Sequence, residues 1–192
     1  MRIKFSPFYF FLLIGLLLVS AVFLRREKKE TENKVVVVVP QDPDYLDPHL
    51  ASAAGTYEMM FNVYEGLLKP APDGTLLPAI AERYSIAEDG LAYTFYLRPG
   101  VKFHNGQTVT AADVQYSLER LMGAHTGQPL SPFFTKIESV ETPDPKRVIL
   151  KLNEVDAALL SNLTTASIIP KDYKDLDTRP VGTGPFRFVE YR

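Results

Sequence analysis

The feature that most constrains this chain is an apolar segment without charge near its amino terminus. Residues Phe5 to Leu24 contain no charged side chain, and basic residues flank them at Lys4 and from Arg25 to Lys29. The segment approaches the roughly 20 residues that a helix needs to cross a bilayer and exceeds the core of about 7–15 residues in a secretory signal. No polar face interrupts it, which argues against a core helix of a globular domain. We therefore expect residues 1–24 to be a signal or anchor segment.

Two fates are open for this segment. Small residues at Val19-Ser20-Ala21 would permit cleavage after Ala21. The basic cluster from Arg25 to Lys29 would hinder that cleavage, which favours retention as a membrane anchor. Basic residues on both sides do not set the orientation by the positive-inside rule. We expect the following domain to be periplasmic or at the cell surface, either membrane-anchored or exported by this signal.

Composition excludes several classes of protein and site. The chain has no cysteine, which excludes disulfides, thiolate metal sites and a cysteine nucleophile. Its net charge of −2, with both signs interspersed, provides no basic surface for nucleic acid. His49, His104 and His125 lack the spacing of a zinc site, so we interpret each as solvent-exposed or locally hydrogen-bonded. We expect no cofactor, no metal, no nucleic-acid partner and no catalytic residue.

The rest of the chain divides into a linker and one domain. Residues 25–34 are polar and charged without periodicity, as in a flexible linker. Residues 35–192 are enough for one domain with its own core. The run from Val35 to Val39, closed by Pro40, is typical of a buried central strand covered on both faces. Hairpins and helices follow without strict alternation, which predicts a strand-rich α/β or α+β domain.

Local patterns place the individual elements. A helix is expected from Thr56 to Leu67, and a hairpin of Tyr84–Ile86 and Tyr93–Leu97 around Asp89-Gly90. The clearest helix runs from Thr110 to Met122, because Asp113 follows Thr110 by three residues and forms an approximate capping box. Shorter elements are a strand at Val101–Phe103, a hairpin of Ile137–Thr142 and Arg147–Leu152, a helix at Asp156–Leu163, and strands at Ile168–Ile169 and Phe186–Tyr191.

The segment Gly182-Thr183-Gly184-Pro185-Phe186 is rich in glycine but is not a phosphate loop. It lacks the Lys-Ser/Thr pair of such loops and is not followed by a helix. We interpret it as a tight crossover, where glycine lets the backbone pass close to another strand or a ligand. The ten tyrosines and twelve phenylalanines are interpreted mainly as core, with those near a cleft as walls of a ligand site.

A series of short motifs runs from about Val35 to Arg192. In order, these are Leu46-Asp47-Pro48, Val63 to Leu68, Pro78 to Glu82, Tyr93 to Arg98, Gly100 to Gly106, Thr110 to Val114 and Gly182 to Phe186. Each motif is weak by itself, but the series in this order and spacing resembles the solute-binding proteins of ATP-driven (ABC-type) peptide importers. That family, family 5, includes oligopeptide-, dipeptide- and nickel-binding proteins.

The resemblance implies a type II periplasmic-binding-protein-like lobe, with a mixed sheet, β-hairpins and flanking helices. Such proteins have two lobes that close around a ligand and are generally much longer, so this chain looks incomplete, with the second lobe missing. The implied protein is a monomer and not an enzyme. It captures a peptide or a related small solute and delivers it to the permease subunits of an ABC transporter. The alternative is a membrane-anchored sensor or adaptor domain that reuses the lobe without transport.

The resemblance also implies two places of ligand contact. Matching by position selects Ser52, Ala53, Ala54 and Gly55, through backbone contacts that suit extended peptides, and Phe133 within Ser131-Pro132-Phe133. The groups that pair with a peptide's charged ends lie largely in the missing part of such proteins. The ligand therefore stays open among peptide, nickel and oligosaccharide.

Overall fold

The computed structural model describes residues 36–39 and 41–190. The expected signal or anchor, residues 1–24, and the expected linker, residues 25–34, lie outside these described residues. Within the described part, no helix is long and apolar enough to cross a membrane. Residues 1–38 and residues 39–192 form two separate units, and the fold is that of the second.

The strand predicted over Val35–Val39 is wrong for the residues that are described. Residues 36–39 have no regular secondary structure, and Val36, Val37 and Val38 are exposed. A β-branched run forms a strand only where a neighbouring strand takes up its backbone hydrogen bonds. No described strand pairs with this run.

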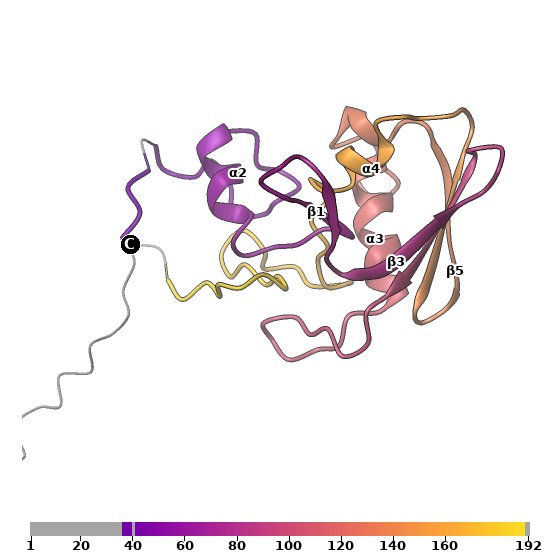
Figure 1. Cartoon of the computed structure of the whole chain (residues 1–192). Coiled ribbons are helices and arrows are strands. Elements are labelled where there is room, and N and C mark those ends of the chain that lie inside the picture. Colours follow the sequence, from indigo (N-terminus) through magenta and orange to yellow (C-terminus); the bar gives the residue numbers. More distant parts are fainter. Residues whose placement is uncertain (1–35, 40, 191–192) are drawn as a thin grey trace, which may run out of the picture. The chain divides into compact units, whose positions relative to one another are not determined.

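The largest element is a four-stranded sheet. Its strands lie in the order β3 (Ala81–Ile86), β4 (Ala92–Leu97), β6 (Arg147–Leu152) and β5 (Ile137–Asp144), and Figure 1 labels the two edge strands, β3 and β5. The two predicted hairpins are confirmed as β3–β4 and β5–β6. The expected mixed sheet is not found among the described strands, which pair only in antiparallel fashion. Tight hairpin turns force antiparallel pairing within β3–β4 and β5–β6. The strands β4 and β6 also pair in antiparallel fashion.

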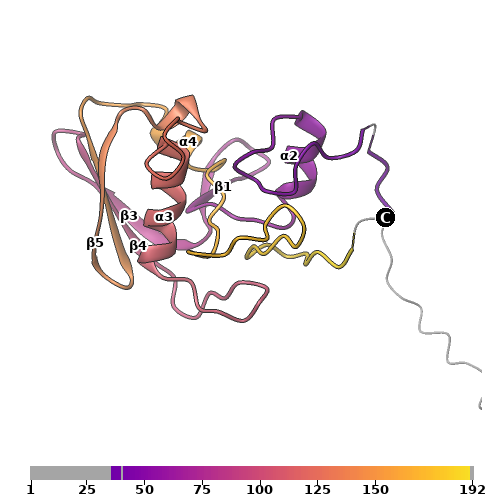
Figure 2. The ribbon, with the colours of Figure 1, turned by 180° about the vertical axis from the view of Figure 1, so that it is seen from behind.

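Alternation along the two central strands decides which face of the sheet is buried. Every second residue is buried, namely Tyr93, Phe95, Leu97, Val148, Leu150 and Leu152. These side chains share a core with Val114, Leu118 and Leu121 of α3 (Ala111–Met122). Each fully buried large aliphatic side chain contributes about 1.5–3 kcal/mol. Figures 1 and 2 show α3 along one face and no other described element on the opposite face, so one face of the sheet is open.

Both ends of α3 are closed by local interactions. The backbone N–H of Thr110 donates to the Asp113 carboxylate at 2.8 Å, which confirms the predicted capping box. The other oxygen of Asp113 accepts the N–H of Lys171 at 2.9 Å. Gly123 ends the helix in the left-handed region, with φ of 93°. Asp113 therefore starts the helix and also holds a segment far along the chain.

The remaining elements are short. They are α2 (Ala54–Met60), β1 (Leu68–Pro70) paired with β2 (Leu76–Pro78), the 3-10 turn η1 (Pro132–Phe134) and α4 (Leu159–Asn162). The helices predicted over Thr56–Leu67 and Asp156–Leu163 are therefore shorter than expected.

Three predicted strands do not form among the described residues. Val101–Phe103 contributes only the isolated bridge between Lys102 and Thr108, and Ile168–Ile169 and residues 186–190 have no strand structure. Ile168 and Ile169 are nevertheless fully buried. Their apolar side chains pack in the two hydrophobic clusters while their backbone bonds go to other groups, such as Glu65 O for Ile168 N–H at 2.9 Å.

A buried ion pair connects the Leu46-Asp47-Pro48 motif to α3. Arg120 donates from Nη1 to Asp47 Oδ1 at 2.9 Å and from Nη2 to Oδ2 at 2.7 Å. The side chains are 14% and 7% exposed, respectively. Asp47 Oδ1 also accepts the N–H of His49 at 3.0 Å. The bidentate pair therefore fixes the loop that leads into α2 against the last turn of α3.

The Gly182–Phe186 segment passes close to the chain, as predicted for a tight crossover. Its neighbour is the irregular segment after α2 rather than a strand. Gly184 N–H donates to Val63 O and Phe186 N–H to Asn62 O, both at 2.9 Å. A Cβ at Gly182 would lie 2.0 Å from Val63 O, so this approach requires glycine.

His104 fastens the same segment through both ring nitrogens. Its Nε2 lies 2.8 Å from Gly184 O, and its Nδ1 lies 3.4 Å from Gly182 N. A carbonyl only accepts and a backbone N–H only donates, so the neutral tautomer with its proton on Nε2 satisfies both groups. The expectation that His104 is exposed or locally bonded is wrong: it is partly buried, and its ring partners lie about 80 positions away in the chain.

Replacing Arg120 by alanine should destabilise the domain, because it leaves the Asp47 carboxylate buried without its partner. We expect a loss of about 3 kcal/mol in the free energy of unfolding, measured by urea denaturation of the full chain. The matched control is Lys136→Ala, which removes an exposed ion pair to Glu154 and should cost about 0–1 kcal/mol. Equal losses in the two variants would contradict a structural role for the buried pair.

Replacing Gly182 by alanine should also destabilise the domain, by about 2–3 kcal/mol, because the added methyl group overlaps the Val63 carbonyl. Gly55→Ala is the control, since a Cβ there meets no atom within 4 Å. That change lies in α2 and should raise stability by about 0.5 kcal/mol. Both values come from denaturation curves, and a neutral Gly182→Ala would show that the segment does not dock on Val63.

Candidate functional site

A hollow of about 270 Å³ lies between the loop before α2, α2 itself, the end of α3 and η1. Its wall is made mainly of aromatic and aliphatic side chains. The lining residues are Pro48, His49, Tyr57, Phe61, Leu121, Leu130, Ser131, Pro132, Phe133, Phe134 and Thr165. A concave, largely apolar surface with a few polar groups is the usual form of a ligand site.

Three aromatic rings at this hollow remain accessible to solvent. Tyr57, Phe61 and Phe133 are 38%, 50% and 52% exposed, whereas Phe134 and Leu121 are buried. Large aromatic side chains gain free energy from burial, so three exposed rings at one hollow leave apolar area available for a ligand.

Local hydrogen bonds hold the Tyr57 ring and the turn that carries Phe133. The Tyr57 hydroxyl donates to Ala51 O at 2.8 Å, which fixes the ring against the chain before α2. Ser131 caps η1, because its Oγ accepts the N–H of Phe133 at 3.3 Å. The hollow is therefore bordered by elements that are held independently of any ligand.

The start of α2 is organised by the carboxylate of Asp44. Its Oδ2 accepts the N–H groups of Ser52 and Ala53 at 2.8 Å and 3.0 Å and the Ser52 hydroxyl at 2.7 Å. Its Oδ1 accepts the Thr56 hydroxyl at 2.7 Å. The hydrogen bonds from Thr56 and then Ser52 hold the pKa of Asp44 well below its usual range.

The structure brings the two predicted contact regions to the same hollow in different ways. Phe133 lines the hollow directly. Ser52, Ala53, Ala54 and Gly55 do not line it, but they begin the helix that carries Tyr57 and Phe61. The N–H groups of Ser52 and Ala53 already bond to Asp44, so they are not free to donate to a peptide. A binding role for these five residues stays a prediction.

His49 lies at the hollow and corrects one expectation. Predicted to be exposed or locally bonded, it is 5% exposed and bonds through Nε2 to the distant Ser167 O at 2.8 Å. Its Nδ1 has no hydrogen-bond partner among the described residues. Burial, and next the nearby Arg120 charge, lower its pKa to about 4, although the Ser167 bond and Asp47 act in the opposite direction.

The described residues provide no evidence for a metal site. They contain no group of three or more histidine, cysteine, aspartate or glutamate side chains that could hold an ion. His125 instead contacts Glu119, with 3.3 Å between Nε2 and Oε2, and its ring lies 4.9 Å from that of Tyr116. It is a locally bonded histidine, as the sequence indicates.

Sequence reasoning missed Tyr57 and Phe61 as possible site residues. The predicted apolar stripe of this helix includes Met60 and Tyr64, which are buried. Tyr57 and Phe61 are four residues apart and therefore share another face of the helix. An aromatic pair at this spacing outside the core stripe is the signal that could have found them.

The match to a protein-family model covers residues 75–192. Its description is "Bacterial extracellular solute-binding proteins, family 5 Middle". The matched part contains the four-stranded sheet, α3 and the Gly182–Phe186 segment.

Individual relatives agree with this match. The glutathione-binding protein GsiB of Pectobacterium atrosepticum is 32% identical over 153 residues, which cover 76% of this chain and 30% of the relative. Heme-binding protein A of Haemophilus influenzae is 37% identical over 144 residues, or 60% of this chain and 26% of the relative. The chain therefore spans about a third or less of the curated relatives it matches.

A solved structure shows the same fold. It is the ABC transporter-associated periplasmic binding protein DppA from Helicobacter pylori, in complex with the peptide STSA. The TM-score is 0.72 at 30% identity, and the match covers 79% of this chain and 35% of the solved chain. The mixed α/β architecture predicted for a type II lobe is confirmed by this likeness.

The stability of the domain should depend on pH through His49. Its pKa is lower in the folded state than the ordinary 6.5, so the folded state binds fewer protons. Stability is therefore greatest above pH 6.5 and should fall by about 3 kcal/mol as the pH drops from about 6.5 to about 4. Urea denaturation of the wild type and His49→Gln across this range tests it. If the variant loses as much stability as the wild type, another group is responsible.

Proposed function

Because the chain belongs to the bacterial extracellular solute-binding proteins of family 5, we propose that it is part of the extracytoplasmic substrate-binding component of an ABC transporter. This protein captures a peptide and delivers it to the permease subunits in the membrane. The family consists of binding proteins, so the protein breaks no bond in its ligand.

The observation that carries the proposal is the aromatic hollow beside α2. Tyr57, Phe61 and Phe133 face solvent around about 270 Å³ of space. This arrangement suits the apolar side chain of a peptide, because each ring can bury area against it. His49 and Ser131 also line the hollow, but each makes a structural contact: His49 Nε2 lies 2.8 Å from Ser167 O, and Ser131 Oγ accepts the Phe133 N–H at 3.3 Å.

A peptide is favoured over the other candidate ligands. One relative is named for glutathione, which is itself a tripeptide, and the solved relative holds the peptide STSA. Another relative is named for heme. A small hollow with three separate rings fits a side chain better than a porphyrin, because His49, the histidine that lines it, is only 5% exposed and its Nε2 is already bonded to Ser167 O.

Capture would use a second lobe that closes over this one. A hollow that leaves three rings about half exposed cannot enclose a ligand by itself. The ligand would shift the protein from the open to the closed state because it makes more contacts in the closed state. The size of the shift would equal the difference in its binding free energy between the two states. The protein would act as a monomer, exported or held at the membrane by residues 1–24.

The proposal is tested with the peptide Gly-Trp-Gly, because the chain contains no tryptophan and the peptide's fluorescence is free of protein background. We expect saturable binding that Phe133→Ala weakens by about tenfold, since the lost ring contact is worth about 0.5–1.5 kcal/mol beyond its area. Phe186→Ala is the matched control, because Phe186 is 60% exposed and does not line the hollow.

Two results would contradict the assignment. Saturable binding of hemin or of a nickel–histidine complex, without binding of Gly-Trp-Gly or Gly-Gly-Gly, would reject a peptide as the ligand. Equal weakening by Phe133→Ala and Phe186→Ala would reject the hollow as its place of binding. Calorimetric titration with the same ligands provides the second measurement.

A further inference from the structure

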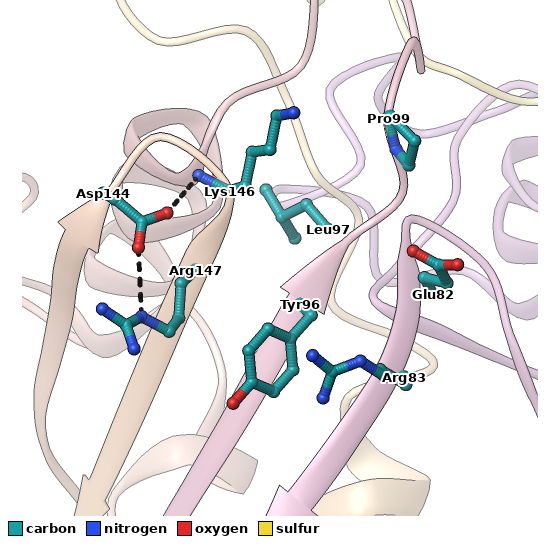
Figure 3. A pocket seen from close by; sticks show the side chains of 8 residues that line it. All are labelled: Glu82, Arg83, Tyr96, Leu97, Pro99, Asp144, Lys146 and Arg147. Carbon is teal, nitrogen blue, oxygen red and sulfur yellow. Dashed lines mark hydrogen bonds and ion pairs between the residues drawn. The ribbon is translucent and has the colours of Figure 1, made fainter.

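A row of polar side chains crosses all four strands on the open face of the sheet. The register places Arg83 on β3 beside Tyr96 on β4, Tyr96 beside Arg147 on β6, and Arg147 beside Asp144 on β5. Tyr96 and Arg147 alternate with the buried residues that face α3, and residues paired across neighbouring strands share a face, so all four lie on the opposite face. Figure 3 shows all four side chains at one shallow pocket.

The Arg83 guanidinium is held in place but is not neutralised. Its Cζ lies 3.4 Å from the centroid of the Tyr96 ring, which is a cation–π contact. Arg83 forms no ion pair with a described carboxylate. Stacking occupies the face of the guanidinium and leaves its N–H edge for a carboxylate.

The other charges at this pocket leave it cationic. Asp144 is already engaged, because it pairs with Arg147 Nε at 3.1 Å and accepts the N–H of Lys146 at 3.0 Å. Lys146 therefore adds an ammonium group without a described carboxylate partner. Glu82 is the only other carboxylate among the lining residues, and it opposes the two free cations in part.

The shape of the pocket favours a macromolecular partner over a small solute. It has a volume of about 420 Å³, and the exposed Pro99 forms an apolar edge. It lies on a sheet face that no described element covers, so a small molecule would stay largely in water. An acidic loop of a protein could place a carboxylate on Arg83 and bury the apolar edge at the same time.

We propose that the row from Arg83 to Arg147, with Lys146, is a docking surface for an acidic segment of the permease. A carboxylate of that segment binds the N–H edge of Arg83 while Tyr96 supports the guanidinium from below. The partner's identity rests on the proposed function, whereas its acidic character follows from the charges. The ligand hollow has no lining residue in common with this surface.

The test uses fluorescently labelled hexaglutamate as the acidic segment and anisotropy as the readout, on the full chain. The chain has a net charge of −2, so its overall charge does not attract such a peptide. We expect saturable binding that weakens as salt is added and that Arg83→Gln weakens by about tenfold. Glu82→Gln should strengthen it, because an opposing carboxylate is removed. Lys151→Gln, on the same face but paired with Glu141, should leave it unchanged.

Several outcomes would overturn the proposal. Unchanged affinity in Arg83→Gln would place binding elsewhere, such as on the basic residues Arg25 to Lys29. Equal binding of hexalysine would remove the charge argument. Competition by acetate or phosphate at the same concentration as hexaglutamate would show a small-anion site. A nitrogen-detected shift of the Arg83 Nε–H resonance on titration gives an independent readout if a variant misfolds.

The two proposals can fail separately. Arg83→Gln should leave the binding of Gly-Trp-Gly unchanged, and Phe133→Ala should leave the binding of hexaglutamate unchanged. A wild-type chain that binds hexaglutamate but not Gly-Trp-Gly would reject the ligand proposal alone. The reverse result would reject the docking surface alone.

Discussion

The structure depends on the bidentate ion pair between Asp47 and Arg120. It is the direct polar link between the loop that begins α2 and the helix that covers the sheet. The attraction between the two charges is opposed by the free-energy cost of removing them from water. The hydrogen bond from the His49 N–H to Asp47 helps to offset this desolvation cost. The same pair places a positive charge beside the His49 ring. This one contact therefore holds the loop before α2 against α3, and its Arg120 charge adds to the burial that lowers the pKa of His49.

Much of the domain could be predicted from sequence because its signals are local. The capping box of Thr110 and Asp113, the hairpin at Asp89-Gly90 and the alternation on β4 and β6 each depend on residues within a few positions. The failures share a different cause. Val36 to Val38 and Ile168–Ile169 have strand composition, but a strand needs a partner, and sequence composition does not show whether one is present. Burial without pairing, as at Ile168, is decided by tertiary packing alone.

The candidate site likewise has parts that the sequence predicts and parts that it does not. Phe133 could be predicted by position within a family pattern, and it lines the hollow. Ser52 to Gly55 are predicted near the site, but the N–H groups of Ser52 and Ala53 are occupied by Asp44, a contact that the sequence pattern does not show. The buried His49 bonds to Ser167 O, which is 118 positions away. Polar contacts across such distances are properties of the folded chain, so the sequence predicts the region of the site better than its chemistry.

The attachment of Gly182 and Gly184 to His104 and Val63 has a consequence for the order of folding during synthesis. The sheet and α3 lie within residues 81–152 and are joined by comparatively short connections, so they can assemble as soon as that stretch has left the ribosome. The segment around α2 is made earlier. The groups that bond to its Asn62 and Val63 carbonyls are the N–H groups of Phe186 and Gly184, which are made much later. The docking of residues 184–186 is therefore a late step, although the lining of the aromatic hollow ends at Thr165 and is synthesised before it. The segment that follows α2 is translated before the sheet but reaches these contacts after the sheet can form.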